Sequence, residues 1–113
     1  MLPLKRSDEY KSRVRIYAQR LAKRYRLEIA DAFISSVRSA EQLIHKNNQA
    51  GTDVPYILTE QQVVLKELYF VSGSAKYCLI YEILDDCVGL ISLWHGMGSR
   101  STDVMARIWR STC

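Results

Sequence analysis

Residues 76–96 read KYCLIYEILDDCVGLISLWHG, and this stretch decides the fold class. Two runs rich in β-branched and aromatic residues flank the acidic pair at 85–86. This pattern predicts two antiparallel strands joined by a two-residue turn. With the turn at 85–86, the register places Tyr81 opposite Leu90.

The same register predicts two different faces for the hairpin, because successive side chains of a strand point to opposite sides. It places Tyr77 opposite Trp94 on one face and Lys76 opposite His95 on the other. The first face is large and aromatic, and we expect helices to cover it. It carries Tyr77, Leu79, Tyr81, Ile83, Val88, Leu90 and Trp94.

The second face is also largely apolar, although fewer elements remain to cover it. It carries Ile80, Ile91 and Leu93 beside the polar Lys76 and His95. An exposed apolar face of this kind is a candidate protein-binding surface. The alternative is that the C-terminal tail covers it.

Upstream of these strands the apolar residues repeat at helical spacing. Residues 2–6 are compatible with a short edge strand, and Ser7 is a typical N-cap ahead of two acidic residues. Apolar residues recur every three to four positions from Tyr10 to Tyr25 and again from Ile29 to Ile44. The short break between the two runs predicts an antiparallel helical hairpin.

The rest of the chain completes an α+β fold class. Residues 47–60 are expected to be a polar connection, and Val63–Val71 to be the first strand of a three-strand meander. We therefore predict a short N-terminal strand and a two-helix antiparallel hairpin packed on a three- to four-stranded antiparallel sheet. Residues 1–97 form the domain, and residues 98–113 form a tail with a short amphipathic helix.

Positive charge is concentrated at the start of the chain. From Lys5 to Arg26, nine Lys and Arg against two acidic residues give +7, whereas the remaining seven Lys and Arg against ten acids give −3. This asymmetry indicates an acidic partner, although a solvated helix face is an equal alternative. The expected partner-facing residues are Lys11, Arg13, Arg15, Arg20, Lys23 and Arg24.

Composition narrows the class of protein. Three irregularly spaced cysteines argue against a disulfide framework and for a reducing compartment, so we expect a cytoplasmic protein. The first residues lack a long apolar stretch, and no apolar run is long enough to span a membrane. Two histidines without a Cys-x-x-Cys pair are a poor metal set, so neither a metal nor a cofactor is expected.

The motifs of the meander carry a resemblance to a known family. YCLIY at 77–81, the acidic turn at 85–86 and LISLWHGM at 90–97 resemble the RelE/ParE superfamily of type II toxin–antitoxin toxins. Members of this superfamily commonly show a Tyr-Arg-x-x-Tyr strand, an acidic turn and a strand that ends in His-Gly. The resemblance covers about residues 4–97.

The superfamily has two main activities, and the resemblance leaves both open. RelE-like members cleave messenger RNA on the ribosome, whereas ParE-like plasmid stabilisation proteins inhibit DNA gyrase by binding. Here Cys78 stands where RelE-like nucleases place an arginine, and the first cation after Gly96 is Arg100. A thiol cannot replace the charge and the donors of a guanidinium, so we favour the ParE-like, non-enzymatic activity.

If the chain is instead an endoribonuclease, its candidate catalytic residues are Lys66, Lys76 and His95. His95 would then act as an acid or base; the alternative is that it is only a strand-end residue. Cys78 is expected to be a structural thiol rather than a nucleophile. A third possibility is a non-toxic module that binds an antitoxin or nucleic acid.

The resemblance also implies a partner. A cognate antitoxin would bind and neutralise the chain, and operator DNA would be reached only through that antitoxin. Its expected contacts are Ile80, Ile91 and Leu93 on the second face, with the basic hairpin facing acidic antitoxin side chains.

Overall fold

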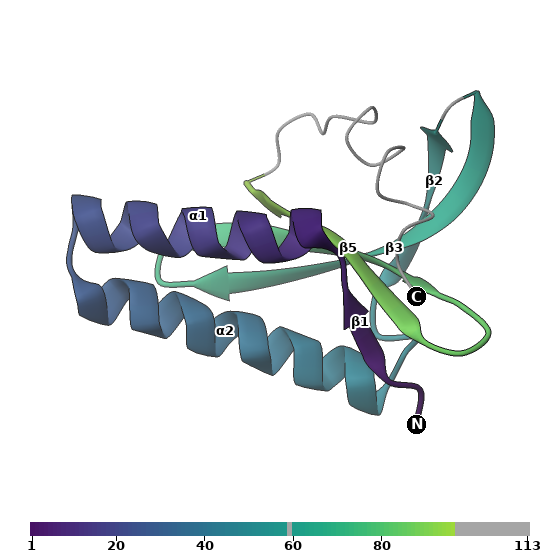
Figure 1. Cartoon of the computed structure of the whole chain (residues 1–113), viewed down its shortest axis with the longest axis horizontal. Helices are drawn as coiled ribbons and strands as arrows, with labels where there is room; N and C mark the ends of the chain where they lie inside the picture. The colour runs from purple at the N-terminus through teal and green to yellow at the C-terminus, as the bar shows by residue number, and fades with distance from the viewer. Residues whose placement is uncertain (59, 97–113) are drawn as a thin grey trace.

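The computed structural model describes residues 1–58 and 60–96, and Figure 1 shows their arrangement. The predicted tail helix in 98–113 lies outside the described residues. One short strand and two helices precede four strands. The elements are β1 (Leu4–Arg6), α1 (Asp8–Arg24), α2 (Leu27–Lys46), β2 (Thr52–Leu58), β3 (Gln61–Ser72), β4 (Ala75–Ile83) and β5 (Val88–His95).

The strands form one mixed sheet in the order β1-β5-β4-β3-β2. The predicted helical hairpin is confirmed as α1 and α2. The three predicted meander strands are confirmed as β3, β4 and β5. The expectation of a three- to four-stranded antiparallel sheet is wrong in two respects. The sheet has five strands, and β1 pairs with β5 in parallel, with Leu4 opposite Val88.

The additional strand, β2, lies inside the segment that was expected to be a polar connection. It pairs antiparallel with β3 along its whole length, from Thr52 opposite Glu67 to Leu58 opposite Gln61. Pro55 and the polar Asp53 obscure the strand pattern in the sequence. Both residues are compatible with β2 because it is an edge strand. Pro55 has no backbone N–H, and an edge strand can accommodate a residue that donates no hydrogen bond to the sheet.

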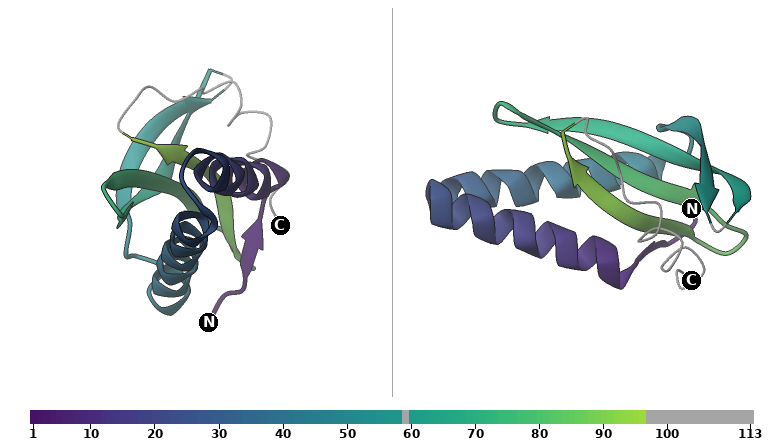
Figure 2. Two further views of the ribbon diagram at one scale, coloured as in Figure 1. Left: turned by 90° about the vertical axis from the view of Figure 1, so that its left-hand side faces the viewer. Right: turned by 90° about the horizontal axis from the view of Figure 1, so that it is seen from above.

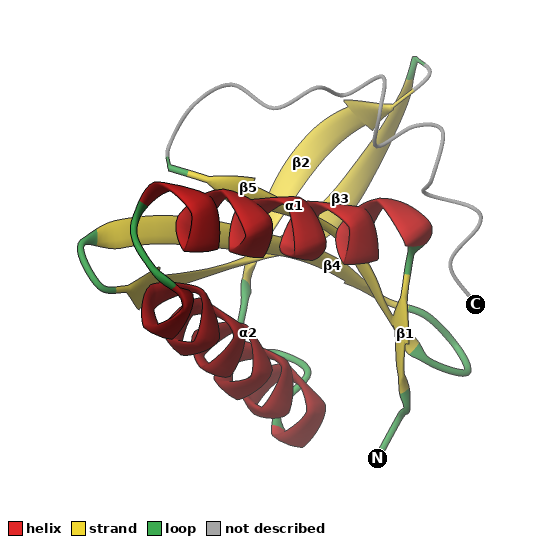
Figure 3. Cartoon of the chain, turned by 60° about the vertical axis from the view of Figure 1, so that its left-hand side comes forward, coloured by secondary structure: helices red, strands yellow, loops and turns green. Residues whose placement is uncertain are grey.

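The two helices pack side by side on one face of the sheet, as the side view in Figure 2 and the turned view in Figure 3 show. Ser7 caps α1 as predicted, since its hydroxyl accepts a hydrogen bond from the Tyr10 backbone N–H at 3.0 Å. Phe33 and Ile44 of α2 are fully buried against Tyr77 and other residues of the sheet. This cluster is the main core.

The opposite face of the sheet is covered as well, which contradicts the expected open surface. The hairpin of β2 and β3 extends beyond the helices in Figure 1. Its side chains Tyr56, Val63 and Leu65 pack with Cys78, Ile80 and Ile91 in a second buried cluster. Ile80 is 0% exposed and Ile91 is 1% exposed.

A β-bulge in β5 changes the predicted hairpin register. Tyr81 lies opposite Leu90 as expected, but Ile80 lies opposite Ser92, so that Ile91 is the extra residue. Ile91 itself stays on the predicted face with Ile80, but from Ser92 onward the side chains of β5 lie on the opposite face from the one predicted.

This change relocates the last three residues of β5. Leu93 is buried in the main core instead of on the second face, and Trp94 packs against the second cluster instead of the core. His95 lies opposite Tyr77, not opposite Lys76. The predicted pairs Tyr77–Trp94 and Lys76–His95 are therefore wrong.

Candidate functional site

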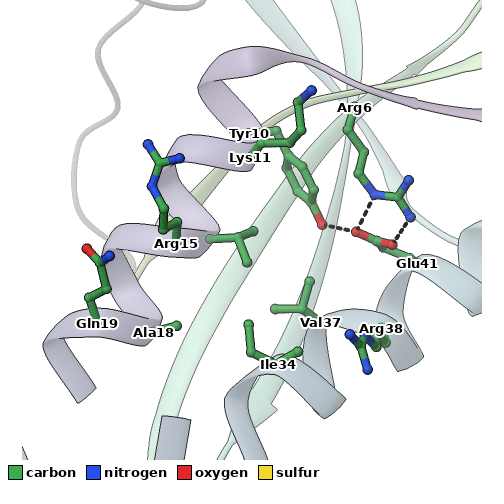
Figure 4. Close-up of a pocket in the computed structure, with 11 residues that line it drawn as sticks. Arg6, Tyr10, Lys11, Arg15, Ala18, Gln19, Ile34, Val37, Arg38 and Glu41 are labelled. Carbon is green, nitrogen blue, oxygen red and sulfur yellow. Dashed lines mark hydrogen bonds and ion pairs between the residues drawn. The ribbon is translucent and has the colours of Figure 1, made fainter. Parts of the chain in front are cut away.

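A groove of about 560 Å³ runs between α1 and α2, with Arg6 of β1 at one end. In Figure 4, Tyr10 of α1 and Glu41 of α2 point toward one another across it, whereas Arg15 and Gln19 extend outward from α1. The groove is lined by Arg6, Tyr10, Lys11, Val14, Arg15, Ala18, Gln19, Ile34, Val37, Arg38 and Glu41. Four of these side chains are cationic and one is a carboxylate.

The one carboxylate of the groove, Glu41, is already satisfied. Arg6 binds it with two hydrogen bonds, from Nε to Oε2 at 3.2 Å and from Nη2 to Oε1 at 2.5 Å. The Tyr10 hydroxyl donates a third bond to Oε2 at 2.7 Å, and the dashed lines in Figure 4 mark all three. The network joins β1, α1 and α2, so it fixes the position of one end of the groove.

The network also changes the pKa values of Tyr10 and Arg6. Burial raises the pKa of the Tyr10 hydroxyl far above its ordinary value, and the negative charge of Glu41 adds to the effect. The hydrogen bond to Glu41 raises the pKa of Arg6. Tyr10 therefore remains a neutral donor, and Arg6 and Glu41 cancel each other's charge.

The remaining cations of the groove, Lys11, Arg15 and Arg38, lie around an apolar floor. Each of the three is exposed, whereas Val14 and Ile34 are partly buried and Val37 is buried. Lys11 has one weak partner, Asp8, at 3.6 Å. An apolar floor with a positive rim is the complement of an amphipathic helix or strand with acidic flanks.

The basic stripe predicted on the first helix does not form one surface. Lys11 and Arg15 line the groove, and Arg20 and Arg24 line a separate pocket at the other end of α1. Lys23 is exposed and lines neither.

Arg13 has a structural role instead of the predicted partner-facing one. It forms an ion pair with Glu9 and donates a hydrogen bond to the Tyr17 hydroxyl at 3.2 Å. Its guanidinium lies 3.7 Å from the centre of the Trp94 ring. The side chain thus fastens α1 to β5.

Sequence reasoning missed three residues of the groove. Arg6 belongs to the basic segment from Lys5 to Arg26 but was not among the expected partner-facing residues, Arg38 lies outside that segment, and Glu41 reads as an ordinary surface residue of an amphipathic helix. Arg6 of β1 and Glu41 of α2 are 35 positions apart in the sequence, so only the tertiary fold brings them together. The signal available in advance was Glu41 on the buried face of α2, between Val37 and Ile44 in helical spacing.

The structure separates the three candidate catalytic residues. Lys66 lies opposite Tyr81 and His95 opposite Tyr77, so these two are four positions apart along β4, about 13 Å. Lys76 precedes Tyr77 and therefore lies on the other face of the sheet.

Each of these residues has its own neighbours. Lys66 is 9% exposed and is paired with Asp53 at 2.6 Å. Lys76 lies 5.0 Å from the centre of the Tyr69 ring. A nuclease that stabilises one phosphate needs its cations and its acid or base within contact of that phosphate. In this structure the three side chains do not meet that requirement.

The expected antitoxin contacts are not at the surface either. Ile80, Ile91 and Leu93 are at most 1% exposed, so a partner cannot reach them in this conformation. The first two belong to the second cluster and Leu93 to the main core. The groove between α1 and α2 combines apolar and basic side chains, which is the character expected of the antitoxin contact.

The two cysteines among the described residues differ in their state. Cys78 is a fully buried thiol outside any disulfide. Cys87 is disulfide-bonded, against the expectation of reduced cysteines. Among residues 1–58 and 60–96, no three His, Cys, Asp or Glu side chains lie close enough together to hold a metal ion.

No family model, curated protein or solved structure matches this chain. Within the part of the chain that the structure describes, no helix combines the length and the apolar character needed to cross a membrane.

Proposed function

We propose that this protein is the toxin of a type II toxin–antitoxin module, ParE-like in that it inhibits DNA gyrase by binding and not by cleaving a substrate. A cognate antitoxin neutralises it in the cytoplasm, where gyrase acts. The observation that carries the proposal is the cationic groove between α1 and α2, together with the resemblance of residues 77–97 to the RelE/ParE superfamily.

The groove supplies what a neutralising partner needs. Its apolar floor, which includes Val14 and Val37, accepts the apolar side of an amphipathic segment. The rim cations Lys11, Arg15 and Arg38 face that segment's acidic side chains and accelerate its association. The antitoxin contact is therefore proposed here instead of at the buried residues of the second cluster.

The placement of the candidate catalytic residues favours binding over catalysis. Lys66 is ion-paired with Asp53, Lys76 lies on the opposite face, and the position of the nuclease arginine is a buried thiol, Cys78. Removal of one group that stabilises transition-state charge costs about 10²-fold or more in rate. A gyrase inhibitor needs a shaped and charged surface but no such constellation.

Controlled expression of the chain in a bacterium should arrest growth and induce the DNA-damage response. Co-expression of the antitoxin should restore growth, because the groove is then occupied. Growth curves, a damage-responsive reporter and total-RNA sequencing are measured in the same cultures. Growth arrest with cleaved messenger RNA and no damage response would contradict the proposal, and normal growth would support the non-toxic binding module instead.

One observation keeps the endoribonuclease as a second candidate. His95 is exposed and shares a pocket with Arg20 and Arg24, so an acid or base lies beside two cations that sequence reasoning had not placed there. In the same expression experiment, His95→Ala should then abolish messenger RNA cleavage while the thermal midpoint of the purified variant stays close to that of the wild type. Undiminished toxicity of this variant would remove the endoribonuclease.

A further inference from the structure

A second pocket, of about 500 Å³, lies at the far end of the helical hairpin from the Arg6–Glu41 network. The second half of α1, the start of α2, the turn at 72–74 and the end of β5 form its walls. Its polar side chains include Arg20, Arg24, Tyr77 and His95. Inhibition of gyrase by binding, as proposed above, does not use this pocket, whereas the endoribonuclease alternative does.

The charge of the second pocket is not compensated. No acidic residue lines it, and neither Arg20 nor Arg24 has a hydrogen-bond or ion-pair partner among the described residues. Arg6 and Arg13, in contrast, each bind a carboxylate. The helix dipole accounts for a cation such as Arg24 at the end of α1, but not for two guanidiniums that face the same cavity without a carboxylate.

Tyr77 provides an independent observation. It lines the pocket and is only 3% exposed, yet its hydroxyl makes no hydrogen bond with any described residue. Burial raises the pKa of this hydroxyl, so it remains a protonated donor. This hydroxyl is a neutral donor that no described residue occupies, so it is available to a ligand oxygen in the pocket.

His95 is held in place at the same site. Its ring centroid lies 5.2 Å from that of Tyr77 and 6.4 Å from that of Tyr17. The β-bulge at Ile91 is what turns His95 toward these two tyrosines. A histidine ring offers at least one N–H donor in either protonation state, so the pocket combines two guanidiniums, an imidazole and a phenol.

We propose that this pocket binds a nucleoside monophosphate through its phosphate group. Guanidiniums bind phosphate oxygens with paired hydrogen bonds, and the imidazole and the Tyr77 hydroxyl supply further donors. A pocket of this volume is larger than a phosphate ion needs and falls in the usual range for small-molecule sites. Leu21, Tyr25 and Ile29 give the base an apolar wall.

Isothermal titration of the purified full chain with adenosine and guanosine monophosphates tests the proposal, at constant ionic strength because exposed cations are screened by salt. We expect saturable binding with a Kd below about 1 mM for at least one of them. Inorganic phosphate should compete, since it fills the same donors. Binding that does not saturate at concentrations up to about 10 mM would overturn the proposal.

Matched variants separate this site from general charge attraction. Arg20→Gln with Arg24→Gln should weaken binding at least about tenfold. Lys5→Gln with Lys46→Gln removes the same charge from exposed positions outside the pocket and should change the Kd less than about twofold. Equal losses in the two double variants would mean nonspecific attraction and would overturn the proposal, provided that all variants keep the wild-type thermal midpoint.

An oligonucleotide without terminal phosphates distinguishes a small ligand from a nucleic-acid strand. If it binds through Arg20 and Arg24 more tightly than either monophosphate, the pocket recognises a polynucleotide backbone and the proposal is wrong. Weaker binding of the oligonucleotide supports it. Since these titrations use neither gyrase nor the antitoxin, their failure leaves the proposed toxin function untouched.

Discussion

Glu41→Ala should lower the free energy of unfolding by about 3 kcal/mol. The substitution leaves the Tyr10 hydroxyl, which is 1% exposed, without its acceptor and removes both hydrogen bonds of Arg6. The Arg6 side chain is 46% exposed and can be solvated by water. The larger part of the loss therefore comes from Tyr10 and from the gap left beneath the groove. Urea unfolding at neutral pH measures the change.

Two other glutamate variants show whether the network is responsible. Glu28→Ala alters the same helix, but this side chain is 77% exposed and 4.0 Å from Arg26, so we expect a change within about 0.5 kcal/mol. Glu41→Gln keeps an acceptor for Tyr10 and should fall between the two alanine variants. Equal stabilities of Glu41→Ala and Glu28→Ala would show that the network does not hold the helices in place.

Reversal of the charge on the groove rim should weaken antitoxin binding by about 100-fold or more. Lys11→Glu with Arg15→Glu places two carboxylates against acidic partner side chains, and like charges in contact cost several kcal/mol. The fold should tolerate both substitutions, because both side chains are exposed. Position 11 is also near the start of α1, where the helix dipole favours an acidic residue. The affinity of each variant for the antitoxin purified with the chain measures the effect.

A matched double variant controls for net charge in this experiment. Lys5→Glu with Lys23→Glu reverses the same number of charges at exposed positions that line no part of the groove. It should reduce the association rate slightly through long-range attraction and leave the dissociation rate unchanged. If the rim variant binds the antitoxin as tightly as this control, the groove is not the antitoxin site.

The elements with strong local signals were predictable from the sequence. Ser7 followed by two acidic residues marks the start of α1, and the acidic turn at 85–86 fixes the register as far as Tyr81 opposite Leu90. Helical spacing of the apolar residues identified both helices because one face of each is polar. These features depend on neighbouring residues, so a single sequence contains them.

The features that decide the site depend on residues far apart in the chain. Residues 88–94 are apolar on both faces of the strand, and a strand buried on both sides has no polar face to fix its register. The bulge at Ile91 therefore could not be predicted from the sequence. For the same reason, the faces on which Leu93, Trp94 and His95 lie could not be predicted. β2 was missed for a related reason, since its turn-forming residues obscure a strand that only pairing with β3 stabilises.

The basic stripe shows how the same limitation affects function. Its charge was evident from the sequence, but the helix presents it to three different surroundings: the groove, the Trp94 ring and the second pocket. Only the position of α1 over the sheet divides the stripe in this way. Arg13 in particular has the residue type of a partner-facing cation but the contacts of a structural one.

The claim that this protein acts by binding gyrase can be tested most directly with purified components. The chain is added to DNA gyrase and supercoiled plasmid in one reaction, and to ribosomes translating a defined messenger RNA in another. We predict inhibited supercoiling with trapped, cleaved plasmid, reversed by the antitoxin, and intact messenger RNA. Cleaved messenger RNA together with unaffected gyrase would contradict the account.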